Sequence, residues 1–160
     1  MIVVSNTTPI LSLYKIGQLS LLQGLFGEVT IPTAVYNEIA IYGKNKAGYD
    51  IFDSTSYIHI KEVKSLIAVD LLRPQLGYGE TEAIVLAKEL EVDVLLIDEK
   101  KARRIAQVNA IPVIGTLGIL LLSKFNGLIL EIKTLLDALI DNGIWIDKQL
   151  YQSLLKQAGE

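Results

Sequence analysis

The chain has 160 residues, of which 51% are hydrophobic, and its mean hydropathy is +0.40. This length fits one domain with a sizeable core, and the absence of cysteine excludes a disulfide framework or a thiolate metal site and is typical of the reducing cytoplasm. A formal net charge of −3 excludes bulk attraction as a mode of nucleic-acid binding, so any such role must depend on a local basic patch.

Short apolar stretches alternate with amphipathic segments from the first residue to the last. The apolar stretches have the length of strands, and the amphipathic segments place apolar residues three and four positions apart, as helices with one buried face do. We expect strands at residues 2–4, 29–31, 58–61, 92–97 and 112–114. We expect helices near residues 8–16, 19–26, 32–39, 65–72, 80–87, 100–106, 118–126, 128–141 and 147–156.

This alternation indicates right-handed βαβ units and an α/β fold with a parallel sheet, in a single domain of residues 1–160. Residues 92–97 are apolar except for Asp93, which is typical of a strand covered on both faces. Residues 2–4 lack the basic flank of a signal peptide, and the apolar run at 111–122 is interrupted by Pro112. We therefore expect neither a secreted nor a membrane protein, since a membrane span needs roughly 20 apolar residues.

Polar residues follow three of the expected strands. Asn6 follows the first strand, Asp98 the central one and Thr116 the last. In parallel sheets the carboxyl ends of the strands share one edge, which is where ligands bind. Glu38 and Glu80 lie on helices that can lean over the same edge. Because these are oxygen ligands without cysteine or a suitable histidine, the pattern favours Mg²⁺ or Mn²⁺.

A basic segment begins directly after Asp98. Lys100, Lys101, Arg103 and Arg104 occupy one side of the expected helix, while alanine and isoleucine residues occupy the other. This segment is the one local patch that qualifies for binding a phosphate backbone.

Each of these residues also has an ordinary structural explanation. Asp98 and Thr116 stand where a residue can cap a helix. Glu80 and Glu82 can offset the positive end of a helix macrodipole. Glu38 and the basic segment can be solvated surface. The coincidence of several such residues at one sheet edge is what favours a site.

The only histidine, His59, alternates out of an expected edge strand, and we assign it no catalytic role.

Five segments resemble, in order, successive blocks of the PIN-domain family, in particular a prokaryotic branch of unknown function related to toxin ribonucleases. These segments are VSNTTPI (residues 4–10), VTIPTAVYNE (29–38), GETEAI (79–84), LIDEKKAR (96–103) and GTLG (115–118). The resemblance implies a three-layer α/β/α sandwich, metal-dependent cleavage of RNA, and a homodimer or an antitoxin protein partner.

The family's four acidic positions fall on Asn6, Glu38, Glu80 and Asp98, which the resemblance implies as catalytic residues and ligands of Mg²⁺ or Mn²⁺. Thr116 matches a position where the family often has a hydroxyl residue or a further acid. The departure is Asn6, whose amide offers a carbonyl oxygen but lacks the negative charge, so metal binding should be weaker.

Either Glu82 or Glu99 could restore part of the charge that Asn6 lacks, because both are close to the expected site in sequence.

The resemblance thus implies a metal-dependent ribonuclease, which could be the toxin of a toxin–antitoxin pair. In such an enzyme, the residues that bind the substrate would be Lys100, Arg103 and Thr116. The alternative is a catalytically weak or inactive PIN-like module that binds RNA or a protein partner, with Asn6 as the sign of lost chemistry. A dinucleotide-binding or P-loop domain is not supported, because neither a G-x-G-x-x-G after the first strand nor a Walker A stretch is present.

Overall fold

The computed structural model describes residues 1–160 and is built on a five-stranded sheet in which every pair of neighbours is parallel. The strand order is β3-β2-β1-β4-β5. The strands are β1 (Val3–Ser5), β2 (Val29–Pro32), β3 (Ile58–Lys61), β4 (Val94–Leu96) and β5 (Val113–Ile114). The helices are α1 (Thr7–Lys15), α2 (Leu21–Phe26), α3 (Thr33–Tyr36), the π-helix η1 (Asn37–Ile41), α4 (Ile51–Ser54), α5 (Leu66–Leu72), α6 (Tyr78–Leu90), α7 (Lys100–Val108), α8 (Thr116–Phe125), α9 (Lys133–Asp141) and α10 (Lys148–Gln157).

The strand at the start of the chain and the apolar strand before Asp98 are neighbours in the sheet. β1 is the middle strand of the sheet and runs parallel to β4, with Val3 opposite Val94 and Ser5 opposite Leu96. Because β1 and β4 are in register, the residues that follow them emerge next to each other at the carboxyl edge. The Asn6 amide donates to the Leu96 carbonyl at 2.9 Å, which continues the pairing beyond the strand.

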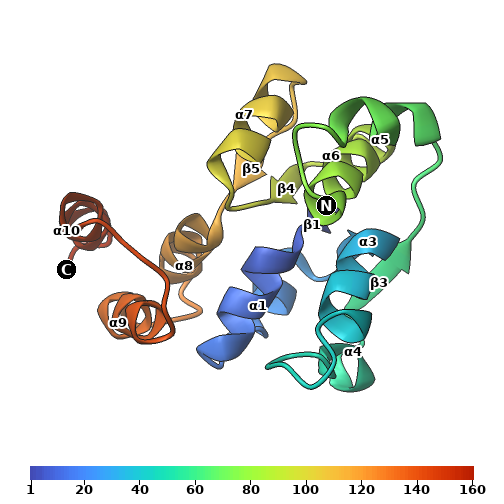
Figure 1. The fold of residues 1–160 in the computed structure, drawn as a ribbon. Helices are drawn as coiled ribbons and strands as arrows, with labels where there is room; N and C mark the ends of the chain where they lie inside the picture. Colours follow the sequence, from blue (N-terminus) through green and yellow to red (C-terminus); the bar gives the residue numbers. More distant parts are fainter.

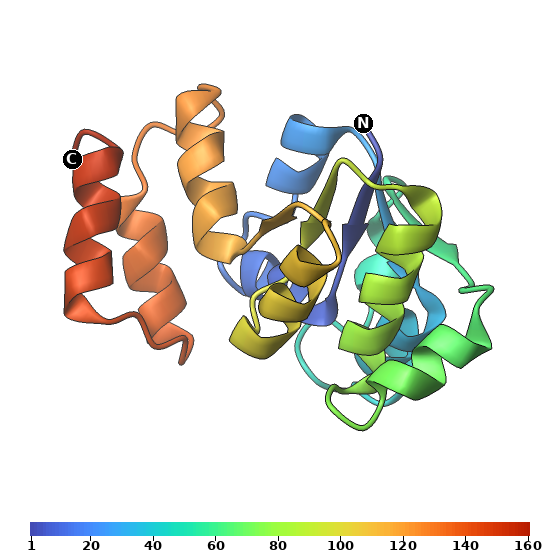
Figure 2. The ribbon, with the colours of Figure 1, turned by 90° about the horizontal axis from the view of Figure 1, so that it is seen from above.

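Helices cover both faces of the sheet, so the expected three-layer α/β/α sandwich is confirmed (Figures 1 and 2). Alternate residues of β1 point to opposite faces: Val3 packs with Ile10 of α1 and Ile119 of α8, whereas Val4 packs with the apolar side of α6 and α7. The two faces therefore have separate hydrophobic cores.

The C-terminal helices α9 and α10 pack together as a hairpin at one end of the molecule (Figure 2). Leu136, Leu139, Leu154 and Leu155 of this hairpin are buried in the same core as α1 and α8. The apolar side of the last helix is thus partly buried within the chain, although Leu150 is 42% exposed.

Two expected helix starts are wrong. The first helix begins at Thr7, with Asn6 at the N-cap position, and not after Thr8. The helix expected from residue 128 begins only at Lys133, because the carboxylate of Glu160 accepts hydrogen bonds from the Ile132 and Lys133 amides at 2.8 and 3.1 Å. A group 28 residues further along the chain therefore caps this helix.

None of the helices has the length and apolar character needed to cross a membrane.

Candidate functional site

Asn6 lies at the carboxyl end of the middle strand and is only 4% exposed. Its backbone is extended, with φ −80° and ψ 175°, and its side chain does not cap α1. The side-chain oxygen Oδ1 is buried and accepts no hydrogen bond within the protein. Since buried polar atoms are nearly always paired, this oxygen is a candidate ligand for a group that binds at the sheet edge.

Glu38 reaches the same edge from the π-helix η1. Its Oε1 accepts from the Gly79 amide at 2.9 Å, and its Oε2 accepts a short hydrogen bond from Thr7 Oγ1. The carboxylate therefore connects the start of α1, directly after Asn6, to the first turn of α6. π-helical turns inside helices are frequent at functional sites, and here the wide turn carries the acidic residue.

Gly79 is required for this approach. A Cβ at that position would lie 2.6 Å from Glu38 Oε1, which is closer than non-bonded atoms come. Two consecutive residues of α6 thus contribute to the site: Gly79 leaves room for the Glu38 carboxylate, and Glu80 provides a carboxylate of its own.

Glu80 occupies the first turn of α6 and is partly buried. Burial raises the pKa of its carboxyl group, and the nearby negative charges of Glu99 and Glu38 raise it further. The Gly77 amide, which donates a hydrogen bond to Oε2 at 3.3 Å, lowers this pKa in part. The expected helix-terminal role is therefore present. The charges of Glu38 and Glu99 nevertheless make this carboxylate one that a cation would stabilise.

Asp98 is held by the residue that follows β5. Its Oδ1 accepts from the Thr116 amide at 2.7 Å and its Oδ2 from Thr116 Oγ1 at 2.6 Å. The alternative that Asp98 caps the next helix is wrong, because Glu99 is the N-cap of α7 and accepts from the Ala102 amide at 2.6 Å. Thr116 is likewise the first residue of α8 and not its cap.

Glu82 and Glu99, the two candidate replacements for the missing charge, both have structural partners. Glu82 Oε1 accepts from the Ala34 amide at 2.9 Å at the start of α3, and Glu99 caps α7. Neither side chain is bonded to Asn6 in the structure. Of the two, Glu99 lies close enough to Glu80 to raise its pKa.

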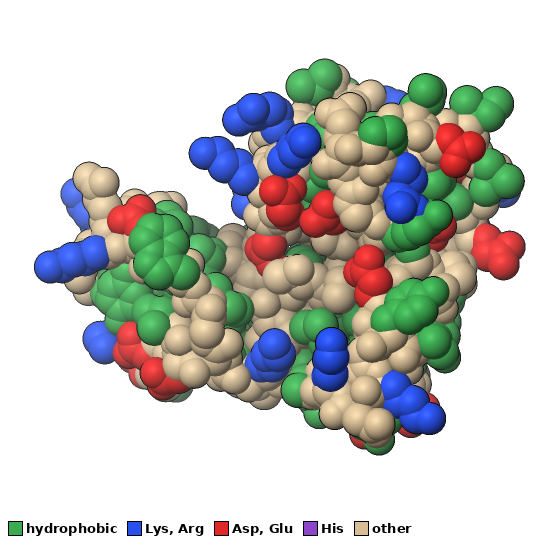
Figure 3. Space-filling model, in the orientation of Figure 1, with side chains coloured by type: hydrophobic (Ala, Val, Ile, Leu, Met, Phe, Trp, Pro, Cys, Tyr) green, Lys and Arg blue, Asp and Glu red, His purple; other side chains and the backbone are tan.

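Basic side chains lie directly beside Asp98. A pocket of about 270 Å³ is lined by Asp98, Lys100, Arg103, Arg104 and Gln107, with no hydrophobic residue. Gly115 keeps this region open, because a Cβ there would lie 2.7 Å from Asp98 Oδ1 and 2.9 Å from Arg103 Nη1. In Figure 3, acidic side chains gather in the hollow at the middle of this face, and Lys and Arg side chains stand above them over α7.

The four acidic positions of the resemblance thus come from four elements that meet at one edge of the sheet: Asn6 after β1, Glu38 on η1, Glu80 on α6 and Asp98 after β4. No group of three or more Asp, Glu, His or Cys side chains is close enough to hold one metal ion. The donor set still suits a hard cation, because Asn6 Oδ1 has no partner and each bound carboxylate oxygen keeps a further lone pair.

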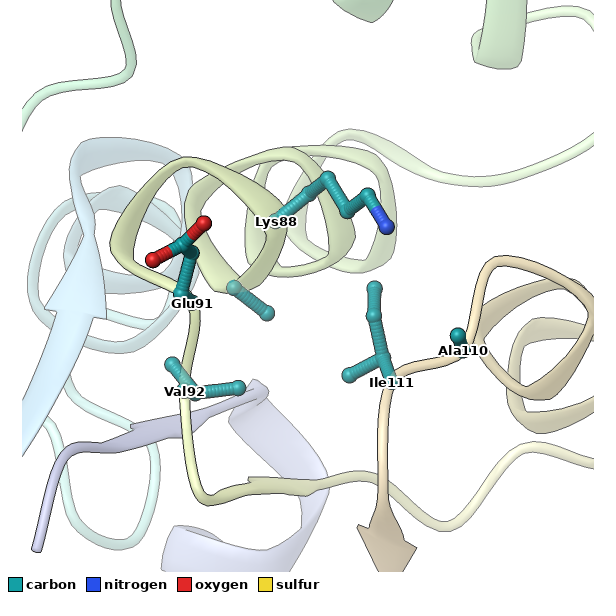
Figure 4. Close-up of a pocket in the computed structure, with 6 residues that line it drawn as sticks. Lys88, Glu91, Val92, Ala110 and Ile111 are labelled. Carbon is teal, nitrogen blue, oxygen red and sulfur yellow. The ribbon is translucent and has the colours of Figure 1, made fainter.

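Other surface features lie away from this edge. His59 is on the edge strand β3 and pairs with Glu28 at 3.4 Å, with both side chains more than half exposed. Figure 4 shows a pocket of about 250 Å³ that includes Val92 before β4 and Ile111 before β5. This pocket is at the amino end of those strands, opposite to the carboxylates.

Sequence reasoning missed Thr7, Gly79 and Gly115 as parts of the site. Thr7 carried a weak signal, as a hydroxyl residue in a strand-to-helix loop. The two glycines each precede a residue that was singled out, but their role depends on contacts with Glu38 and Asp98 from other parts of the chain.

A family model described as PIN domain matches residues 2–160 of the chain. Comparison with curated proteins gave no match, and comparison with solved structures gave none either.

Proposed function

The chain belongs to the PIN-domain family, and on this premise we propose that it is a metal-dependent ribonuclease that hydrolyses RNA phosphodiester bonds with Mg²⁺ or Mn²⁺. The observation that carries the proposal is the arrangement at the carboxyl edge. There, Asn6, whose Oδ1 has no partner, directly follows β1, and Asp98 follows the neighbouring strand β4. Glu80 is under repulsion from Glu38 and Glu99.

Asn6, Glu38, Glu80 and Asp98 are the residues that would hold the metal. When bound, a divalent ion of this kind activates water and neutralises charge on the phosphate. The hydrogen bonds from Thr116 orient Asp98, and those from Thr7 and Gly79 orient Glu38.

The remaining groups act on the substrate. Lys100 and Arg103, which line the pocket beside Asp98, would bind the phosphate on either side of the cleaved bond. Burial, together with the charges of Glu99 and Glu38, raises the pKa of Glu80 in the absence of a metal, and a bound cation would relieve that repulsion.

Incubation with mixed single-stranded RNAs and Mn²⁺ or Mg²⁺ tests the proposal. We expect cleavage that EDTA abolishes and that Asp98→Ala reduces by at least about 100-fold, since charge stabilisation of several kcal/mol is lost. Asp141→Ala, which removes an exposed carboxylate from the end of α9, is the matched control for a general loss of negative charge.

Asn6 favours a second candidate, a PIN-like module that binds RNA or a protein partner without cleaving it. RNA binding that is unchanged by EDTA and by Asp98→Ala, with no cleavage, would support this candidate and contradict the nuclease.

We also propose that the chain forms a homodimer. The apolar faces of α2, α8 and α10 are largely covered, because Leu22, Leu120 and Leu154 are buried within the chain. Exposed apolar side chains lie instead on α5, where Leu66, Ile67 and Leu71 are 68%, 76% and 72% exposed.

Light scattering after size exclusion, on the native chain and on Ile67→Glu, tests the homodimer. A native dimer that the substitution dissociates supports it, whereas a native monomer contradicts it. Co-purification with an antitoxin encoded beside this chain, in place of self-association, would favour the role of toxin in a toxin–antitoxin pair.

A further inference from the structure

A second pocket adjoins Glu38 on the side away from α7. It has a volume of about 450 Å³, within the range of about 300–1,000 Å³ typical of small-ligand sites. Its walls come from α3 and η1 on one side and from α6 on the other. The lining residues are Thr33, Ala34, Asn37, Glu38, Tyr42, Tyr78 and Glu82.

Two exposed tyrosines from different elements line this one pocket. Tyr42 follows η1 and is 75% exposed, and Tyr78 begins α6 and is 56% exposed. The guanidinium of Arg73 lies over the Tyr78 ring, 3.0 Å from its centroid, which holds the ring in place. Exposed aromatic rings beside a polar groove are the platforms on which proteins stack the bases of single-stranded nucleic acids.

The polar groups of the pocket favour a base over a phosphate. Glu38 and Glu82 both line it, and their negative charges repel a phosphate but not a neutral base. The Ala34 amide donates a hydrogen bond to Oε1 of Glu82 and so fixes this side chain. The second carboxylate oxygen of Glu82 stays available as an acceptor. Asn37 adds an amide, which can bond to a base edge as both donor and acceptor.

We propose that this pocket binds one unpaired RNA base that carries an exocyclic amino group, stacked against Tyr42 or Tyr78, next to the bond that is cleaved. The inference rests on the proposed ribonuclease function and adds a base preference to it. Adenine, cytosine and guanine each offer an exocyclic amino group to the carboxylate of Glu82. Uracil has no amino group, and its single N3–H donor lies between two carbonyl oxygens that the carboxylate repels. The pocket therefore selects against uracil.

Binding of fluorescent homopolymers of A, C and U, measured by anisotropy at low salt with EDTA, tests the pocket without cleavage. We expect A and C homopolymers to bind at least several-fold more tightly than U. Tyr42→Leu and Tyr78→Leu should each weaken binding of the A homopolymer, by about 5- to 150-fold where the ring is the one that stacks. Glu82→Gln should reduce the discrimination against U.

The control is Phe125→Leu, which removes an exposed aromatic ring from the end of α8 remote from Asp98. It should leave binding unchanged, and equal melting temperatures of all variants would exclude unfolding as a cause. Equal affinity for the three homopolymers, no binding of any of them, or no effect of either tyrosine substitution would overturn the inference.

A parallel cleavage assay on the same homopolymers with Mn²⁺ separates the two proposals. Cleavage of all three at equal rates, with no base preference in binding, would leave the ribonuclease standing and remove the base pocket. Selective binding without any cleavage would support the base pocket and contradict the ribonuclease.

Discussion

Thr116 donates two hydrogen bonds to the carboxylate of Asp98, from its backbone amide at 2.7 Å and from its hydroxyl at 2.6 Å. One residue thereby engages both oxygens of the acid that follows strand β4. Since Thr116 is 4% exposed, water cannot readily replace the hydroxyl if it is removed. The position of Asp98 is thus determined by the start of α8.

Replacing Thr116 with valine tests this relationship. Thr116→Val keeps the amide but removes the hydroxyl donor to a charged acceptor, so we expect a loss of about 1.5–3 kcal/mol in the free energy of unfolding. RNA cleavage should fall as well, because Asp98 loses one of its two orienting bonds. Thr116→Ser restores the hydroxyl and should recover most of both. Chemical denaturation and cleavage rates provide the measurement, and a stable, fully active valine variant would contradict the account.

A substitution at Gly79 tests the position of the Glu38 carboxylate separately from the stability of the protein. In Gly79→Ala the new Cβ would displace the Glu38 carboxylate, while alanine favours the helix by about 1 kcal/mol relative to glycine. The loss of hydrogen bonds that Glu38 accepts opposes this gain, so we expect little net change in stability. RNA cleavage should be up to about 100-fold slower, as it is when a catalytic group is misplaced. Gly77→Ala is the matched control, since its Cβ would meet nothing closer than 3.9 Å. Equal activity of the two variants would refute the role of Glu38.

The raised pKa of Glu80 predicts a pH-dependent effect on stability. Its cause is burial first, followed by the repulsion from Glu99 and Glu38. The pKa of Glu80 is higher in the folded state than in the unfolded state. Protonation of Glu80 therefore adds to the free energy of unfolding at pH values below the unfolded-state pKa, and this stabilisation is lost as the pH rises through the folded-state pKa. Glu80→Gln should therefore raise the melting temperature at neutral pH with EDTA, and the difference should shrink toward acid pH. A melting temperature that is lower than native at neutral pH would show that this charge is not under repulsion.

The fold was largely predictable because its signals are local. The apolar runs before Asn6 and Asp98 identify the two strands that the sheet places side by side. Gly17 and Gly27, which follow the first two helices, have the positive φ that glycine adopts readily. Strand alternation then leaves one topology class, a parallel sheet with helices on both faces.

The details of the site were not predictable in the same way, since they depend on contacts between distant residues. Thr7 and Glu38 are 31 residues apart, and Asp98 and Thr116 are 18 apart. From sequence alone, Asp98 is the favoured cap of the helix that follows, because aspartate is among the preferred N-cap residues. Only the position of Thr116 in space decides that Asp98 turns toward α8 and leaves the cap of α7 to Glu99.

A substitution at Asn6 distinguishes most clearly between a metal site and an edge of the sheet that is merely polar. Its Oδ1 is buried without a partner, so Asn6→Asp would place a negative charge beside the other carboxylates without adding bulk. Without metal the added charge should lower the melting temperature, because like charges repel at short range. With Mn²⁺ the same charge should raise the cleavage rate.

The most direct test is a calorimetric titration of the native and Asn6→Asp proteins with Mn²⁺. If the carboxyl edge binds a divalent cation, the aspartate variant will bind Mn²⁺ more tightly than the native protein, because the site gains a charged ligand. Equal affinity of the two proteins, or no binding by either, would contradict the assignment of this edge as a metal site.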